Sequence, residues 1–276
     1  MSAKKTKQIK RAVLIGINYK NTAYQLEGCT NDMCAIYKLI SGPRFGYEPQ
    51  DIRYLTDVPD EVNLSEPEKV SFHKSPTKAN IIESLQWLLK GVKKGDQLLL
   101  FASCHGKQVE CLDNTESDNR NEAILCVDNQ LLLDNELWKI LISKVSQGVG
   151  LSLIFDCCHS GSLADLQYCF MFAPYTTNIF SMSIEKSLEI KGNVCSFSAC
   201  YDKEESGDSL FDSLGNGQKM GCFTYYFIEA INETDKSIEC DDFLKAVSDK
   251  LDCNGYCQRP QYSCSKAQMF TSKLPL

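Results

Sequence analysis

The sequence has 276 residues and a formal net charge of −7. A chain of this length can form one α/β domain with a sizeable buried core. The acidic balance disfavours nucleic acid and anionic membrane surfaces as partners, and it permits a cationic substrate. No apolar run approaches the roughly 20 residues of a membrane-spanning helix. From the charge and the missing apolar run together, we expect neither a nucleic acid nor a membrane as partner.

Residues 1–11 form a short basic leader, and we expect residues 12–276 to form the folded domain. The leader carries four lysines and Arg11, but it runs into an apolar strand and not into the apolar core of a signal peptide. We therefore expect a cytoplasmic protein, with a nuclear location as the alternative.

The chain contains 15 cysteines, which is a high and odd count. Most lie inside apolar segments, where a reduced cysteine behaves as a small hydrophobic residue. Zinc binding is the alternative, because Cys253 and Cys257 are four residues apart and Cys264 follows. A second pair with metal-ligand spacing is missing, so we interpret the cysteines as structural thiols.

Short apolar runs alternate with amphipathic segments in the first half of the chain. Thr77 is a suitable N-cap for the second of the expected helices. Residues 58–76 are polar and contain proline, so they predict a surface loop. The predicted elements are strands over 11–18, 51–56 and 96–102, and helices over 30–40 and 77–90.

The second half continues the alternation but contains two stretches without a clear period. Residues 162–187 predict a long mixed insertion, and residues 200–217 an exposed mobile loop. The other predicted elements are a hairpin of 123–127 and 131–133, a helix over 134–145, strands over 151–155 and 193–199, helices over 222–231 and 241–251, and a last strand near Ser263. This order predicts a single α/β domain with a mostly parallel central sheet and helices on both faces.

Two of the expected strands end in reactive side chains. The first is followed by Ser103, Cys104, His105 and Gly106, and the second by Asp156-Cys-Cys-His-Ser-Gly161. Because parallel strands present their carboxyl ends at one edge of the sheet, these residues are expected to meet there.

An imidazole that removes the proton of a neighbouring thiol produces the nucleophilic thiolate. His105 and Cys158 are 53 residues apart, which is similar to the spacing of about 50 in caspases. The pair predicts a hydrolase with a cysteine nucleophile. The alternative is a buried structural histidine beside an inert thiol.

Carboxylates at the same edge suggest what the site binds. Asp156 directly precedes the two cysteines, and Asp32 lies in the first loop between strand and helix. Two converging carboxylates attract an arginine or lysine side chain, and arginine can bind them in a bidentate manner. The alternative for Asp32 is capping of the helix that begins near Thr30.

Acidic loops also offer hard oxygen donors of the kind that calcium prefers, and a solvated acidic surface is the alternative. The residues concerned are Asp113, Glu116, Asp118, Asp134, Asn135, Glu136 and Asp165.

Taken together, these motifs resemble the metacaspases, which are caspase-fold cysteine peptidases. The resemblance is to a short form without a long prodomain and covers nearly the whole chain. It is carried by Ala12–Tyr19, Leu26–Asp32, Ser103–Gly106, Glu122–Ile124, Val127–Asp128, Asp156–Ser162, Phe223–Tyr225 and Gln258–Gln261.

The resemblance implies a caspase-like fold and cleavage of protein or peptide substrates after arginine or lysine. It implies Cys158 as nucleophile and His105 as base, because these positions match the family's motifs. It also implies a monomer, regulation by calcium and self-processing. The implied first specificity pocket consists of Cys29, Asp32, Ser103 and Asp156, and the implied calcium ligands are Asp118, Asp134, Asn135 and Asp165.

Two positions depart from the family's pattern. Cys104 stands where glycine is usual, and Asn135 stands where some relatives have aspartate, which removes one charge from the calcium ligands. Self-cleavage is expected at exposed basic residues. The candidates are Lys186, Lys191, Lys203 and Lys219.

Three other interpretations compete with this one. A caspase-fold scaffold without activity would not need an intact His105 and Cys158. A legumain-like peptidase would prefer asparagine and would enter an oxidising compartment. A thiol-rich metal or redox protein would bind zinc or cycle its cysteines.

Overall fold

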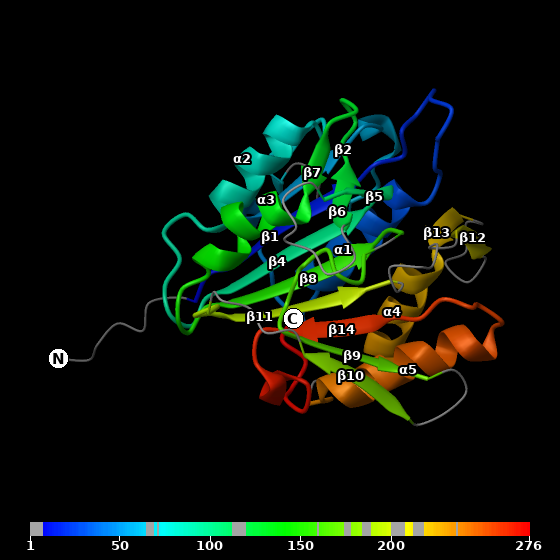
Figure 1. Cartoon of the computed structure of the whole chain (residues 1–276). Coiled ribbons are helices and arrows are strands. Elements are labelled where there is room, and N and C mark those ends of the chain that lie inside the picture. Colours follow the sequence, from blue (N-terminus) through cyan, green and yellow to red (C-terminus); the bar gives the residue numbers. More distant parts are fainter. Residues whose placement is uncertain are drawn as a thin grey trace.

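A mixed nine-stranded sheet forms the centre of the molecule (Figure 1). The strand order is β10-β9-β14-β11-β8-β4-β1-β2-β3. Strands β11, β8, β4, β1, β2 and β3 are mutually parallel, whereas β14, β9 and β10 continue the sheet in antiparallel pairing. The computed structural model describes residues 8–64, 69–70, 72–111, 120–158, 160–173, 178–183, 189–199, 208–211, 218–235 and 237–276.

The strands of the central sheet are short, which is typical of buried α/β strands. They are β1 (Lys10–Gly16), β2 (Ile52–Thr56), β3 (His73–Lys74), β4 (Gln97–Ser103), β8 (Gly150–Asp156), β9 (Tyr168–Phe172), β10 (Ile179–Ser183), β11 (Asn193–Ser198) and β14 (Gln261–Cys264). Two small sheets lie beside it. They contain β5 (Gly106–Glu110), β6 (Arg120–Leu125) and β7 (Leu131–Leu133), and β12 (Asp208–Phe211) and β13 (Gln218–Gly221).

Helices cover both faces of the sheet, because its strands are apolar on both sides. They are α1 (Cys29–Ser41), α2 (Lys78–Leu88), α3 (Asp134–Ile140), α4 (Cys222–Glu233) and α5 (Cys240–Cys253). Side chains of α1, α4 and α5 share one hydrophobic core, and those of α2 and α3 share the other. Alternate residues of β1 contribute to the two cores, Leu14 to the first and Val13 to the second.

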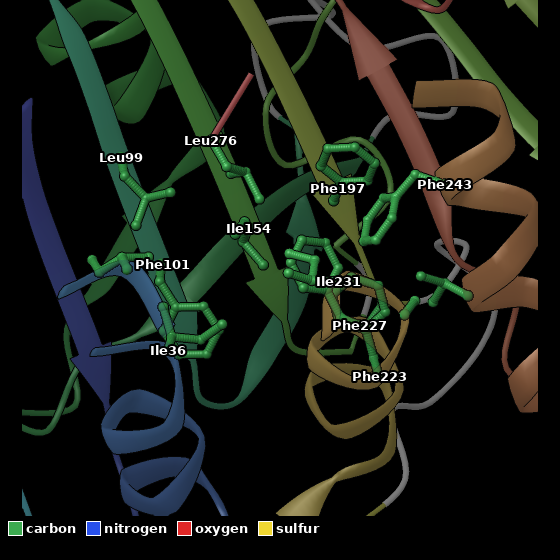
Figure 2. Packing of buried hydrophobic residues seen from close by; sticks show 14 of the residues in the cluster. Ile36, Leu99, Phe101, Ile154, Phe197, Phe223, Phe227, Ile231, Phe243 and Leu276 are labelled. Atoms are coloured by element: carbon green, nitrogen blue, oxygen red, sulfur yellow. The ribbon is translucent and has the colours of Figure 1, made fainter. Parts of the chain in front are cut away.

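Aromatic packing joins α4 and α5 to the sheet (Figure 2). Phe197 of β11 makes edge contacts with Phe227 of α4 and Phe243 of α5, with ring centroids 5.6 Å apart in each case. Figure 2 also shows Phe101 and Ile154 of the neighbouring strands on this same face. This core fixes the ends of β4 and β8, where the reactive residues follow.

The expected architecture is confirmed, and so is the N-cap of α2, where Thr77 Oγ accepts a hydrogen bond from the Asn80 amide at 3.3 Å. Two local expectations were wrong, because β3 lies within the expected 58–76 loop and the helix from Asp134 ends at Ile140. Two further features were not predicted: residues 106–110 form β5, and the 162–187 insertion contains the hairpin of β9 and β10.

Part of the predicted 200–217 loop is also strand, since residues 208–211 form β12 and pair with β13. The β10 strand was not predicted, because all five of its residues are exposed and its sequence lacks the alternation of buried and exposed residues that indicates a strand. Within the described ranges, none of the helices combines the length and the apolar character needed to cross a bilayer.

Candidate functional site

The candidate dyad lies at the carboxyl ends of two neighbouring strands. Strands β4 and β8 pair in parallel, with Ser103 opposite Asp156 at the last register position. One residue further, the Cys104 amide donates to the Asp156 carbonyl at 3.4 Å. The loops that carry His105 and Cys158 therefore leave the sheet side by side, as the two motifs predict.

Gly106 brings the backbones of the two loops into direct contact. A Cβ atom at this position would clash with the carbonyl oxygen of Cys158. Only glycine fits this approach, because every other residue carries the Cβ that would collide.

The loop after β1 orients the His105 ring. Its Nε2 lies 2.8 Å from the carbonyl oxygen of Tyr24. Since a carbonyl oxygen only accepts, this contact is a hydrogen bond when Nε2 carries the proton. The other ring nitrogen, Nδ1, is then the one with a lone pair, so the tautomer suits a base.

Tyr19 contacts the same histidine through its ring and its hydroxyl group. The tyrosine ring lies 4.9 Å from the imidazole, and its hydroxyl accepts the His105 amide at 3.0 Å. The hydroxyl donates in turn to the Leu125 carbonyl at 2.6 Å. Burial raises the pKa of Tyr19, so the phenol stays protonated and keeps this bond.

Sequence reasoning did not assign a role to Tyr19 or Tyr24. Both belong to the loop after the first strand. Only the order of the strands in the sheet could have indicated that this loop lies near His105. Because β1 lies next to β4, the loop after β1 has to pass beside His105.

The two adjacent cysteines occupy different surroundings. Cys157 is 1% exposed, whereas Cys158 is half-buried. The neighbouring Cys104 side chain, followed by burial, raises the pKa of Cys157 well above that of an ordinary thiol. A thiol held protonated is a poor nucleophile, which favours Cys158 as the reactive sulfur. His159 lies outside the described residues.

The four predicted pocket residues are brought together, and all are buried. Asp32 Oδ2 accepts a hydrogen bond from Ser103 Oγ at 2.8 Å, and its Oδ1 accepts one from the Gly221 amide at 3.0 Å. Asp156 Oδ2 accepts from the amide and the hydroxyl of Thr224 at 3.0 and 2.7 Å. Cys29 is 3% exposed in the first turn of α1.

Gly221 covers the two carboxylates in this structure. A Cβ atom there would clash with Asp156 Oδ2 and would lie 3.0 Å from Asp32 Oδ2. The N-cap of α1 is Gly28, which has no side chain, and the described bonds of the Asp32 carboxylate are with Ser103 and Gly221.

The structure describes three of the four predicted calcium ligands. Asp134 is 1% exposed, and its Oδ2 accepts the Glu122 amide at 2.9 Å. Asn135 donates from Nδ2 to the side-chain oxygen of Asn121 at 3.1 Å. Asp165 has a positive φ of 55° in the loop after β8, and Asp118 lies outside the described residues.

The donors that the structure describes are oxygens, as calcium requires. In the part of the chain with assigned positions, no group of three or more histidine, cysteine or acidic side chains is placed to hold a metal ion. The described donors therefore fit the ion in chemical type without forming a complete set of ligands.

Known proteins resemble this chain along most of its length. The metacaspase, peptidase C14 domain matches residues 10–167. Metacaspase-3 of Trypanosoma cruzi is 31% identical over 279 residues, which covers 96% of this chain and 74% of the relative. Metacaspase-1 of Kluyveromyces lactis is 28% identical, covering 93% and 66%, and metacaspase-1 of Schizosaccharomyces pombe is 26% identical, covering 93% and 67%.

The fold has a relative of known structure as well. The crystal structure of a Geobacter sulfurreducens protein superposes with a TM-score of 0.64 and 20% identity, covering 97% of this chain and 98% of the other. This likeness concerns the fold alone.

The family match spans both strand ends that carry the candidate dyad. It also disfavours the inactive scaffold, the legumain-like peptidase and the thiol-rich metal protein as interpretations of the chain. The chain belongs to the metacaspases, and it is a cysteine-type endopeptidase with a caspase-like fold that acts on protein substrates.

Proposed function

We propose that the chain cleaves peptide bonds after arginine or lysine, with Cys158 as the nucleophile and His105 as the base. The observation that carries the proposal is the convergence of the Asp32 and Asp156 carboxylates on one point beside the strand ends.

The arrangement of His105 supports its role as base. When Nε2–H is donated to the Tyr24 carbonyl, Nδ1 is left to take the proton of the Cys158 thiol. The thiolate then attacks the carbonyl carbon of the substrate, and the imidazolium returns its proton to the leaving amine. Water hydrolyses the resulting thioester and regenerates the thiol.

The close approach of Gly106 to Cys158 supports an oxyanion site. Backbone N–H groups at these positions are suited to hold the negative oxygen that develops during attack. Because the groups belong to rigid strand ends, they need little rearrangement when the charge appears.

The pocket supports a basic substrate side chain. Its described hydrogen bonds come from neutral donors, namely the Ser103 and Thr224 hydroxyls and two backbone amides. A guanidinium or ammonium group would form stronger, charge-assisted bonds with the same carboxylates. Since Gly221 lies over both of them, a substrate side chain reaches them when this residue is displaced.

We also propose that calcium regulates the enzyme through Asp118, Asp134, Asn135 and Asp165. The hard oxygen donors around the start of α3 support this part. Bound calcium would supply positive charge that joins these loops to one another.

Self-processing is the last part of the proposal. Of the four candidate lysines, Lys191 and Lys219 are described and exposed, and Lys186 and Lys203 lie outside the described residues. Lys219 forms an ion pair with Glu27 and directly precedes the segment that covers the pocket.

Fluorogenic peptides that end in arginine, lysine, asparagine or aspartate test the specificity, each with calcium and with chelator. We expect hydrolysis of the arginine and lysine peptides, with a loss of at least about tenfold in chelator. Equal rates for the arginine and aspartate peptides would refute the acidic pocket. Full activity in chelator would refute calcium regulation but leave the specificity intact.

A further inference from the structure

Two buried cysteines, Cys104 and Cys157, directly precede the two residues of the candidate dyad in the chain. Cys104 and Cys157 each follow the last paired residues of β4 and β8, which are Ser103 and Asp156. The Cys104 amide still bonds to the Asp156 carbonyl, so the strands stay adjacent at this level. The exposed fractions of the two side chains are 3% and 1%.

The two side chains are neighbours, because Cys104 and Cys157 directly follow the paired residues Ser103 and Asp156 and pack in the same hydrophobic core. Both are free thiols. Neighbouring parallel strands are about 4.8 Å apart, which is within the Cα separation of about 4.4–6.8 Å that a disulfide requires.

We propose that Cys104 and Cys157 are an oxidative modification site, at which a two-electron oxidant such as hydrogen peroxide forms a disulfide across the ends of β4 and β8. Two S–H bonds break and one S–S bond forms. The two sulfurs lose two electrons and two protons, and these reduce the peroxide to two molecules of water.

The disulfide would disturb the dyad because of its position in the chain. His105 follows Cys104 directly, and Cys158 follows Cys157. The two sulfurs would move together to a bond of about 2.05 Å, which pulls the two loops toward each other. A displacement of about 1 Å at reacting groups can lower the rate about 100-fold.

Tyr19 offers a second route for the same disturbance. Cys104 and Cys157 pack in the same core cluster as Tyr19, whose hydroxyl holds the His105 amide. Its hydroxyl bond to the Leu125 carbonyl ties the neighbouring small sheet to the same point.

Other adjacent cysteines of the sheet lack this arrangement. Cys195 and Cys264 face each other on β11 and β14. Their thiols, however, point to oxygen acceptors, with Cys195 on Ser152 Oγ at 3.8 Å and Cys264 on the Lys266 carbonyl at 3.2 Å. This pair is therefore an internal control for unselective oxidation.

The first test maps the bond in the Cys158→Ala variant, in which the reactive thiol cannot form a competing disulfide. The protein is treated with diamide, which takes the same two electrons and two protons, and is then alkylated under denaturing conditions and digested. We expect one linked peptide that joins Cys104 to Cys157, and separately alkylated Cys195 and Cys264. Alkylated Cys104 and Cys157, or equal linkage at Cys195 and Cys264, would overturn the proposal.

The second test measures activity in the wild type and in Cys104→Ser. Diamide should lower the wild-type rate about 100-fold, with recovery in dithiothreitol, and it should change the rate of Cys104→Ser less than threefold. Equal losses in both proteins would place the effect at another thiol and refute the site. If the serine variant fails to fold, Cys104→Gly replaces it, because glycine removes the thiol without adding volume.

Mapping by mass does not depend on peptide cleavage, so a failure of the proposed specificity would leave this result interpretable. The raised pKa of Cys157 adds a further expectation, since the thiolate is the reactive form. Disulfide formation should therefore accelerate as the pH rises into the alkaline range.

Discussion

The dyad region and the acidic pocket occupy the same edge of the sheet but are built differently. His105 and Cys158 are half-buried and held by the ends of two adjacent strands. Asp32 and Asp156 are almost fully buried, and they bind residues of a distant segment, Gly221 and Thr224.

This difference separates the chemistry from the choice of substrate. Short connections from the sheet, with Tyr19 and Tyr24 beside them, fix the reacting groups. The pocket is completed by residues far along the chain, so its shape depends on how α4 and β13 pack. Changes in the first region should affect every substrate, and changes in the second should affect basic substrates selectively.

The largest effect is expected from Cys158→Ala. Removal of the proposed nucleophile should lower hydrolysis of every peptide at least about 1,000-fold while the protein stays folded. Steady-state rates and circular dichroism measure the two properties. Cys157→Ala is the matched control, and a similar loss there with Cys158 intact would contradict the assignment.

Gly106→Ala should have the next largest effect. The added Cβ would clash with the Cys158 carbonyl, so the two loops have to separate, and we expect a rate loss of about 100-fold for all substrates. Gly150→Ala is the control at the other end of β8, because its nearest neighbour is 4.0 Å away. Equal rates for the two variants would show that the contact does not matter.

Asp32→Asn changes the pocket and leaves the dyad residues unchanged. It removes one charge from the pocket while keeping an oxygen that can accept the Gly221 amide. We expect kcat/KM for an arginine peptide to fall about 30-fold, which corresponds to about 2 kcal/mol of charge-assisted bonding. Because Cys158 is untouched, its alkylation rate by iodoacetamide should stay the same, and a parallel loss of that rate would contradict a pure specificity role.

Tyr19→Phe should have the smallest effect. The change removes the hydroxyl between the His105 amide and the Leu125 carbonyl, and it leaves the tilted ring next to the imidazole. We expect about a tenfold loss of kcat and a decrease of about 1–3 kcal/mol in the free energy of unfolding. Denaturant titration measures the stability, and an unchanged kcat would remove Tyr19 from the support of the base.

Much of this architecture could be predicted from local patterns. The apolar runs of β1 and β4 are uninterrupted, that of β8 is broken only by Ser152, and Thr77 marks the start of α2. The β9–β10 hairpin could not be predicted, because β10 is exposed on both faces and its sequence carries no buried period. The same reasoning explains the dyad, since His105 and Cys158 directly follow strong strands and were predicted, whereas the supporting Tyr19 and Tyr24 in the loop after β1 were not.

The sequence by itself determined which side chains end β4 and β8, because a buried parallel strand needs an apolar run and the reactive residues begin where that run stops. Only the tertiary structure decided that Tyr24 and Tyr19 hold His105, that Gly221 lies over Asp32 and Asp156, and that Cys104 and Cys157 are neighbours in one core. These contacts join segments from different strands and helices. Their geometry follows from strand order and helix packing, which local periodicity does not encode.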